Sequence, residues 1–307
     1  MKAQYTTEIV EAPRRFEYWN DVGCRHCLQA DSKLLGTPVF DGAMSVSSIG
    51  MLDMAIMSSP LHHWRRDAHH IRSNPDDDLW LAFMVSGEAY LAQDGRQTRL
   101  QSGDMALYDG ARPFEFALGP EKIYLTRLPR KSLLSRCPEA EHLTAQLIDA
   151  RRPGVMALRS MLEEAGTCEF NDAESAVRYS AALLDVLALS LAAPGSRATA
   201  AEKNDLYKRV LAYLRENYTD PQLNLHVLAA AHHVSERTLT RAFAQHNQTP
   251  MDVLRRVRLQ ASYRALTEGN VGNVTTAALD AGFSDLSHFS RVFRAAFGCT
   301  PQSLLSH

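Results

Sequence analysis

The sequence has few cysteines and no long apolar run, and both shortages limit what the chain can be. Its five cysteines form no even, regularly spaced set, which suits a reducing cytoplasm rather than a disulfide framework. The longest apolar run, AALLDVLALSLAA, is too short for a bilayer and carries Asp185, so we expect no membrane span. The first residues, MKAQYTTEIVEAP, have no apolar segment behind their lysine, unlike a secretory signal.

Histidine is missing where a metal-dependent barrel enzyme would need it. Such an enzyme holds its metal with a His-x-His pair, a Glu and a further His on facing strands. Here HHWRRDAHH (62–70) has adjacent histidines, which on a strand point to opposite faces, and no histidine lies between residues 71 and 141. We therefore expect no metal site, no cofactor and no enzymatic activity, and we interpret the motif as a solvated edge and turn.

Cys24 and Cys27 have the Cys-x-x-Cys spacing of redox motifs and of half a zinc site. The other cysteines, Cys137, Cys168 and Cys299, are scattered and supply no second pair. No strand is predicted before the motif, as a thioredoxin-like site would require. We therefore favour two packing cysteines on a first helix, with redox sensing as the alternative.

What the sequence does contain is a soluble protein's composition with an uneven charge. Its 307 residues suggest two domains, and 45% apolar with 22% charged residues is ordinary for a soluble protein. Residues 203–307 hold 12 Lys/Arg and 8 Asp/Glu, a net charge of +4, whereas residues 1–202 hold 21 and 27, a net charge of −6. A basic module joined to an acidic one is typical of a nucleic-acid binder with a separate sensing domain.

Changes of pattern divide the chain into four segments. Residues 1–140 begin with a helix over 12–30 and continue as short alternating segments between Gly and Asp-Gly turns, which favours a β-sandwich or barrel. Residues 141–192 become helical and so apolar that they need a partner, either the β-domain or a second chain. Residues 193–202 are a Pro-Gly-broken linker, and residues 203–307 are all helical.

Two stretches of the helical tail share a Leu/Phe-Thr/Ser-Arg-x-Phe core and a closing Thr-Pro. HHVSERTLTRAFAQHNQTP and AGFSDLSHFSRVFRAAFGCTP each predict a turn followed by a short helix that carries an outward arginine, and 251–268 predicts a long helix between them. Two short helices around a tight turn match a helix-turn-helix, whose second helix can enter the DNA major groove. The alternative is a helical solenoid with merely solvated arginines.

Residues 203–301 resemble the DNA-binding domain of AraC/XylS-type transcription regulators. The resemblance is carried by LAAAHHVSERTLTRAF, TPMDVLRRVRLQASYRAL and AGFSDLSHFSRVFRAAFGCTP. It implies an all-α domain in which two helix-turn-helix motifs reach successive major-groove segments. Two departures occur: the family's Tyr-Arg after the closing proline is replaced by QSLLSH, and His232-His233 occupies the first turn.

The same resemblance assigns the contacts with DNA. It places the first recognition helix over Arg237, Thr240 and Arg241, and the second over Ser287, Ser290 and Arg291. Arg237 is expected to read a base, guanine being the natural partner of a bidentate arginine. The other two arginines, one in each helix, could equally hold phosphates.

Residues 12–140 resemble a second module of these regulators, the AraC-type ligand-binding-like domain. The supporting motifs, in order, are YWNDVGCR, FDG, QDGR, SGDMALYDGARPFEF and LPR. The resemblance implies a cupin-like β-barrel that holds a small effector, aromatic compounds among them, so that the whole chain has an α+β fold. Candidate effector-binding residues are Arg65, Trp80, Phe83 and Tyr108, with plain barrel core as the alternative. Since Trp80 and Phe83 are three apart, both cannot point inward on a regular strand.

The sequence therefore predicts a cytoplasmic, effector-responsive regulator that binds promoter DNA as a homodimer through residues 141–192. Activation by contact with RNA polymerase is the family's commoner mode, and repression is the alternative. A metal-dependent cupin enzyme with a helical interaction tail, or a constitutive DNA-binding protein with a non-sensing barrel, would be the rival interpretations.

Overall fold

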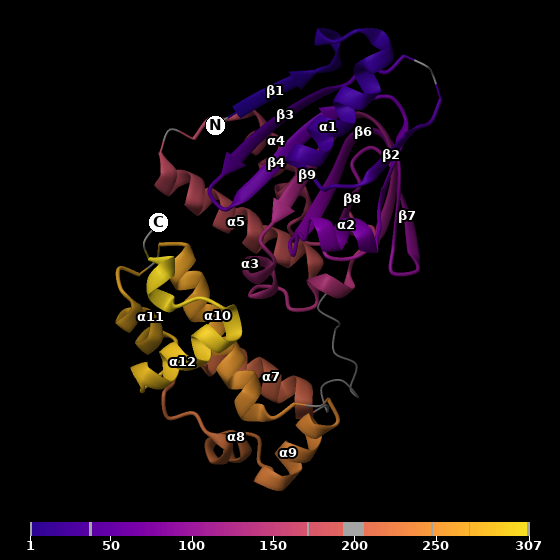
Figure 1. Cartoon of the computed structure of the whole chain (residues 1–307). Coiled ribbons are helices and arrows are strands. Elements are labelled where there is room, and N and C mark those ends of the chain that lie inside the picture. Colours follow the sequence, from indigo (N-terminus) through magenta and orange to yellow (C-terminus); the bar gives the residue numbers. More distant parts are fainter. Residues whose placement is uncertain are drawn as a thin grey trace. The chain divides into compact units, whose positions relative to one another are not determined.

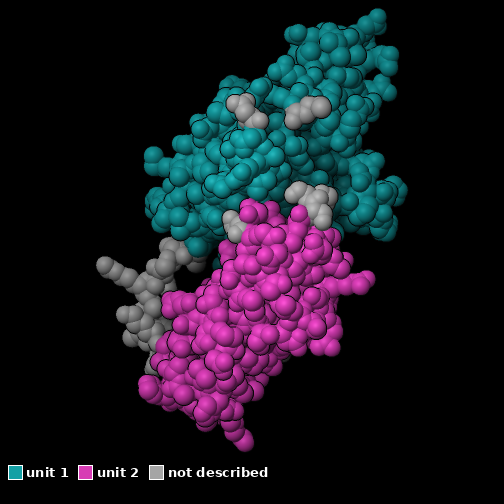
Figure 2. All heavy atoms as spheres, turned by 90° about the vertical axis from the view of Figure 1, so that its left-hand side faces the viewer, with its two compact units in different colours: residues 1–192 teal, residues 193–307 magenta. Residues whose placement is uncertain are grey.

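A computed structural model describes residues 2–36, 39–170, 172–192, 206–246, 248–269 and 271–305. The chain forms two compact units, residues 1–192 and 193–307, which Figure 2 colours separately. The expected linker, residues 193–202, lies outside the described residues. Among the helices of the described ranges, none has both the length and the apolar character that crossing a bilayer requires.

Unit 1 is built on an antiparallel sheet that has nine strands within the described residues (Figure 1). They are β1 (Lys2–Thr6), β2 (Asp31–Leu34), β3 (Ala43–Ile49), β4 (Leu52–Ser58), β5 (His62–Arg66), β6 (Leu79–Gln93), β7 (Arg96–Leu100), β8 (Met105–Asp109) and β9 (Phe114–Leu128). One path of pairing runs β1-β3-β4-β9-β5-β2, and β6 pairs with β7, β8 and β9.

Two long strands, β6 and β9, join the halves of the sheet. They pair along their whole length, and the first half of β9 also pairs with β5 while its second half pairs with β4. The pairing slips between Met84 and Gly87, where Gly87 has a φ of +101° and an added Cβ would lie 2.8 Å from the Gly119 carbonyl oxygen. Bulges of this kind bend a sheet. The cupin-like fold class predicted from the sequence is confirmed.

The two faces of this sheet bury different partners. The inner face packs against α1 (Arg15–His26), which contributes Trp19 and Val22 to its core. The opposite face packs against α4 (Val155–Thr167) and α5 (Ala173–Leu191), which form a helical hairpin. The shorter elements are η1 (Thr7–Ile9), η2 (Ala12–Arg14), α2 (Ala68–Ser73), α3 (Arg130–Leu134) and η3 (Ala140–His142).

Unit 2 is helical and has two separate cores. Its elements are α7 (Leu206–Asn217), α8 (Leu225–Ala231), α9 (Glu236–Ala244), α10 (Pro250–Thr267), α11 (Val274–Asp280), α12 (Leu286–Phe297) and η4 (Pro301–Leu304). The first core gathers α7, α8, α9 and the start of α10, and the second gathers the rest of α10 with α11 and α12. One helix, α10, therefore belongs to both cores, where the sequence predicted a long helix between the repeated stretches.

Candidate functional site

The two helix pairs of unit 2, α8–α9 and α11–α12, close their turns in the same way. In the first turn the backbone N–H of Val234 donates to Ala229 O over 3.0 Å, and in the second Phe283 donates to Ala278 O over 3.0 Å. The left-handed residue of the first turn is His233, with a φ of 54°, and that of the second is Gly282, with a φ of 83°. The repeated letters of the sequence thus correspond to a repeated backbone geometry.

The second turn needs its glycine for two reasons. A left-handed φ is costly for residues with a Cβ. In addition, a Cβ on Gly282 would lie 2.4 Å from the Tyr218 carbonyl oxygen, which is backbone and cannot swing away. The end of α7 therefore approaches this turn too closely for any side chain.

Both second helices, α9 and α12, begin at capping residues and bury one apolar face. The Ser235 hydroxyl accepts the N–H of Thr238 over 3.2 Å, and Asp285 Oδ1 accepts the N–H groups of Ser287 and His288 over 2.8 and 2.9 Å. The backbone N–H of His288 is the main reason why the pKa of Asp285 is lowered. Buried aromatic and aliphatic residues hold the inner faces: Leu239, Phe243, Phe289 and Phe293.

The structure leaves all six predicted DNA-contacting residues exposed on the outer faces of α9 and α12: Arg237, Thr240, Arg241, Ser287, Ser290 and Arg291. Thr240 and Ser290 occupy equivalent places, and each donates its hydroxyl to a carbonyl of its own helix over 2.9 Å. Arg291 Nη2 lies 3.1 Å from His288 Nδ1. Among the ion pairs of the described residues, none involves the three arginines.

The second helix pair also borders an open hollow of about 930 Å³. Ser290, Arg291 and Arg294 line it from α12, and residues 300–302 line it from the start of η4. Arg294 was not among the residues singled out from the sequence for DNA contact, although its place outside the apolar stripe was visible there. The family's missing Tyr-Arg falls here, where Thr300 instead caps a short 3-10 helix by accepting the N–H of Ser303 over 3.3 Å.

In unit 1, the histidine motif 62–70 is a strand followed by a helix rather than one edge and turn. His62 is fully buried: its Nε2 accepts the Trp19 indole N–H over 3.2 Å, and its Nδ1 lies 2.9 Å from Pro60 O. Burial is the main reason why the pKa of His62 falls to about 4. Within the described residues, Asp67, His69 and His70 form the one group of three possible metal ligands, and Asp67 and His70 already serve there as the capping box of α2.

Cys24 and Cys27 lie at the end of α1, where redox chemistry was the alternative to packing. Burial raises the pKa of the Cys27 thiol to about 12, and Cys24 Sγ contacts Ala30 O at 3.6 Å. A thiol with so high a pKa holds little of the thiolate that disulfide exchange requires. The burial of Cys27 and the contact of Cys24 with Ala30 favour a packing role for the two cysteines.

The four candidate effector residues do not share one site. Trp80 and Tyr108 stack on the inner face of the sheet with ring centroids 6.1 Å apart. Phe83 packs on the opposite face, beside the helical hairpin, and contacts Tyr124. Arg65 is 62% exposed and lies 3.9 Å from Glu115. The sequence argument that Trp80 and Phe83 cannot both face inward agrees with these positions.

Cross-strand pairing puts Trp80 in a row of register partners that runs across five neighbouring strands and includes polar and charged side chains. The register aligns Ser48 of β3 with Asp53 of β4, Asp53 with Arg127 of β9, Arg127 with Trp80 of β6, and Trp80 with Tyr108 of β8. The row borders a cavity of about 350 Å³ that the end of α1 also lines. In the adjoining row Ala55 and Ala82 pair with Leu125 on either side, and all three belong to the buried core. Sequence reasoning missed the charged residues of the row because pairing partners cannot be read from spacing.

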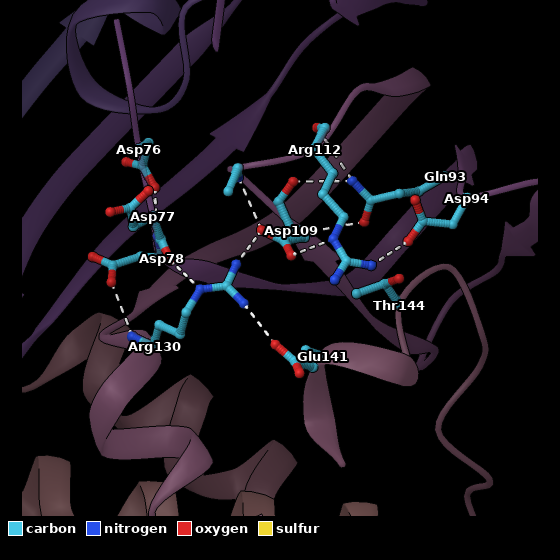
Figure 3. A network of polar contacts seen from close by, with 12 residues as sticks. Asp76, Asp77, Asp78, Gln93, Asp94, Asp109, Arg112, Arg130, Glu141 and Thr144 are labelled. Carbon is cyan, nitrogen blue, oxygen red and sulfur yellow. Dashed lines mark hydrogen bonds and ion pairs between the residues drawn. The ribbon is translucent and has the colours of Figure 1, made fainter. Parts of the chain in front are cut away.

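A buried carboxylate, Asp109, organises the polar network of Figure 3. Arg130 donates to its Oδ1, and Arg112 Nε lies 3.2 Å from its Oδ2. The side chain of Gln93 holds its backbone, accepting from Asp109 N over 2.8 Å and donating to Asp109 O over 3.0 Å. These residues come from the motifs QDGR, SGDMALYDGARPFEF and LPR, so the resemblance rests largely on one structural junction.

The network continues from the cavity toward the helical segment. Arg127 Nε lies 2.9 Å from Asp78 Oδ2, while Asp78 Oδ1 accepts the N–H of Arg130 over 2.9 Å. Arg130 Nη1 reaches Glu141 Oε2, 3.3 Å away in η3. Arg96 continues the same junction by donating to Thr144 Oγ1 over 2.7 Å. A chain of ion pairs and hydrogen bonds thus joins the cavity wall to residues 140–144.

Known proteins resemble the chain in both units. Residues 19–206 match the AraC-binding-like domain and residues 228–307 match the helix-turn-helix domain. The transcriptional activator NphR of Rhodococcus sp is 31% identical over 274 residues, which cover 85% of this chain and 80% of NphR. An HTH-type transcriptional activator RhaS, of Pectobacterium carotovorum, is 40% identical over 96 residues, 31% of this chain and 34% of RhaS.

The crystal structure of the AraC-like transcriptional activator CuxR supports the same fold. It aligns with 92% of this chain and 100% of its own at a TM-score of 0.56 and 18% identity. The family and function predicted from the sequence are confirmed. The chain belongs to the AraC family of transcription regulators, in which a ligand-binding-like domain precedes a helix-turn-helix DNA-binding domain.

Proposed function

We propose that this regulator activates transcription by placing α9 and α12 in successive major-groove segments of promoter DNA. The observation that carries the proposal is the pair of equivalent arginines, Arg241 and Arg291, which lie 50 positions apart on helices with the same capping, turn and buried face. Both helices pack against α10 through their own cores. A shared rigid helix is what two groove contacts about one DNA turn apart would need.

The outward residues divide by the contacts their chemistry suits. Arg237, exposed in the first turn of α9, would read a base edge, and Thr240 and Ser290 are small enough for close groove contact. Arg241, Arg291 and Ser287 then position the two helices on phosphates or bases. The related proteins NphR and RhaS are transcriptional activators, which supports activation by this chain. Activation would proceed by contact with RNA polymerase in the cytoplasm.

Unit 1 would supply the effector response and the dimer contact, with no catalytic role. Residues 141–192 expose apolar side chains, notably Met156 at 78% and Leu189 at 52%, which a second copy of the chain would cover. The ionic chain from Arg127 through Asp78 and Arg130 to Glu141 offers a contiguous route from the cavity to this segment. An effector must bind one arrangement of the dimer better than the other to change DNA binding.

Footprinting of the full chain on DNA from its own genome tests the proposal. Arg237→Ala should relax sequence preference by about 1–3 kcal/mol at one position, and Arg241→Ala should weaken all fragments alike and lower the salt dependence by about one charge. Arg215→Ala, an exposed arginine of α7, serves as the matched control for loss of charge. Equal affinity of wild type and both α9 variants for every fragment would contradict these roles.

A further inference from the structure

Arg258, in the middle of α10, lies between the two cores of unit 2. Val253 and Leu254, which precede it, belong to the first core, and Leu259 and Leu266, which follow it, belong to the second. Arg258 is half-buried, and burial is the main reason why its pKa is lowered. Removing a guanidinium from water costs free energy unless its N–H groups find acceptors in the protein. Its hydrogen bonds therefore show what it holds in place.

The acceptors of Arg258 are backbone carbonyls that follow α7. Its Nε donates to Tyr218 O over 2.8 Å, and its Nη2 donates to Asp220 O over 2.5 Å. Since α7 ends at Asn217, these carbonyls belong to the segment that leads on to α8, the first helix of the first helix-turn-helix pair. Hydrogen bonds from a charged donor are roughly twice as strong as neutral ones, and the planar fork of an arginine also fixes their direction. Arg258 thus holds this segment against α10.

The turn of the second helix pair closes on the same point. Gly282 lies in that turn, between α11 and α12, and the residues on either side of it are buried in the second core. A Cβ added to Gly282 would lie 2.4 Å from Tyr218 O and 3.0 Å from both Thr219 O and Arg258 Nε. Three parts of unit 2 therefore meet at the Arg258 junction: the segment after α7, the middle of α10 and the turn before α12.

We infer that Arg258 is a positioning residue that fixes the distance and rotation between α9 and α12, so that the chain binds its two DNA segments at one spacing. The inference rests on the proposed function, in which both helices enter one duplex. Without the junction, the two cores would be connected only through α10, an 18-residue helix, and long helices bend. The junction is a second connection, because it ties the segment before α8 to the turn before α12. Two connections resist a rotation that one would allow.

The spacing of the two DNA segments measures the stiffness of this junction. Adding or removing one base pair between the segments turns one of them by about 35° relative to the other and moves it by about 3.4 Å. A rigid unit 2 must then deform itself or the DNA, and either deformation costs free energy. A unit 2 with a loose junction would follow the change at little cost.

The experiment compares the full chain with Arg258→Lys, which keeps the positive charge but replaces the fork by a point donor. The probes are the preferred DNA of the chain, found by footprinting, and the same DNA with one base pair added or removed between the protected segments. We expect the wild type to lose at least about tenfold in affinity at either changed spacing. In Arg258→Lys this loss should shrink to about threefold or less. Arg256→Lys, exposed on the same helix, is the matched control and should behave like the wild type.

A role in folding alone would give a different pattern. If Arg258 only stabilised unit 2, Arg258→Lys would weaken binding to all three duplexes by the same factor, and that outcome would overturn the inference. Equal binding of the three duplexes by the wild type would overturn it too, as would a loss of affinity at changed spacing that is the same in Arg258→Lys and in the wild type.

A second measurement needs no DNA and separates this inference from the proposed function. Spin labels at Ala244 of α9 and Ala295 of α12, both exposed, report the distance between the two helices by double electron–electron resonance. Attaching the labels through a non-natural amino acid leaves the five cysteines in place, and an excess of unlabelled chain suppresses signals between copies. The distance distribution should be narrow in the wild type and broader in Arg258→Lys, and equal distributions would overturn the inference. Failure of the full chain to prefer any DNA would refute the proposed function, whereas the distance distributions alone would then decide whether Arg258 fixes α9 against α12.

Discussion

The interiors of the two units differ in how many polar and charged side chains they bury. Unit 1 buries charged and polar side chains, among them His62, Arg66, Gln93 and Asp109, whereas Ser262 is the one buried polar residue in the described part of unit 2. Arg66 illustrates the first kind, because its guanidinium donates to the carbonyls of Gly110, Gln29 and Asn74 over 2.6–2.9 Å.

The difference matches the tasks that the two units perform in the proposed function. A polar interior depends on every partner being in place, so ligand, pH or a single substitution perturbs it strongly. Unit 2 keeps its charges outside, where the proposed function requires them for contact with DNA, and its interior is almost wholly apolar. Three experiments test whether the two interiors are destabilised for these separate reasons.

The largest effect is expected at Asp109. Asp109→Ala removes the carboxylate that Arg112 and Arg130 share and should lower the free energy of unfolding of unit 1 by about 3–4 kcal/mol, because a buried polar network loses the acceptor at its centre. Hydrogen exchange of β6 and β8 during urea unfolding of the full chain measures it. Ser262→Ala, whose hydroxyl donates only to Leu259 O of its own helix, should cost less than about 1 kcal/mol in unit 2. If Asp109→Ala and Ser262→Ala lowered the free energy of unfolding by similar amounts, the two interiors would not differ in the way we describe.

The second-largest effect is expected from acid, which should destabilise unit 1 by protonating His62. Its pKa is about 4 in the folded chain against 6.5 for an exposed histidine, so the unfolded state binds the proton first. The stabilisation is therefore complete above pH 6.5 and is lost as the pH falls toward 4, by about 3 kcal/mol. His62→Gln cannot titrate, and its unfolding should depend less on pH between 6.5 and 4.5. If the free energy of unfolding changed with pH equally in the wild type and in His62→Gln, the acid sensitivity would belong to other groups.

The smallest of the three effects on stability is expected from the left-handed turn at Gly282. Gly282→Ala places a Cβ against the Tyr218 carbonyl in a left-handed turn and should destabilise unit 2 by about 2 kcal/mol, read from thermal unfolding of the full chain. His233→Gly changes the equivalent residue of the first turn, relieves its left-handed strain and should alter stability by less than about 1 kcal/mol. A larger loss at His233 than at Gly282 would mean that the two turns are not equivalent.

Much of unit 2 could be predicted from the sequence because its signals are local. Ser235 and Asp285 cap helices within three residues of themselves, and Phe243 and Phe293 recur on an apolar stripe with the helical period. The six predicted contact residues therefore all lie on exposed faces. Arg294 was not singled out because its partners in the hollow, around Thr300, come from a separate turn.

Unit 1 resisted prediction where its geometry depends on pairing between distant strands. Ser48 and Trp80 lie in one row only because β4 and β9 separate them in register. Arg65 and Arg66 are neighbours in sequence, yet one is in solvent and the other fully buried, since strand residues alternate between faces. The strand β1 and the helix α2 were also not foreseen, the latter because Asp67 and His70 form an unusual capping box.

The most direct test of the proposed function is a hydroxyl-radical footprint of the full chain on its preferred DNA, repeated with Arg241→Ala and with Arg291→Ala. We predict two protected segments about one helical turn apart, roughly 10 base pairs, with each variant weakening a different segment. A single protected segment, or two variants that weaken the same segment, would contradict the claim that α9 and α12 read neighbouring grooves of one duplex.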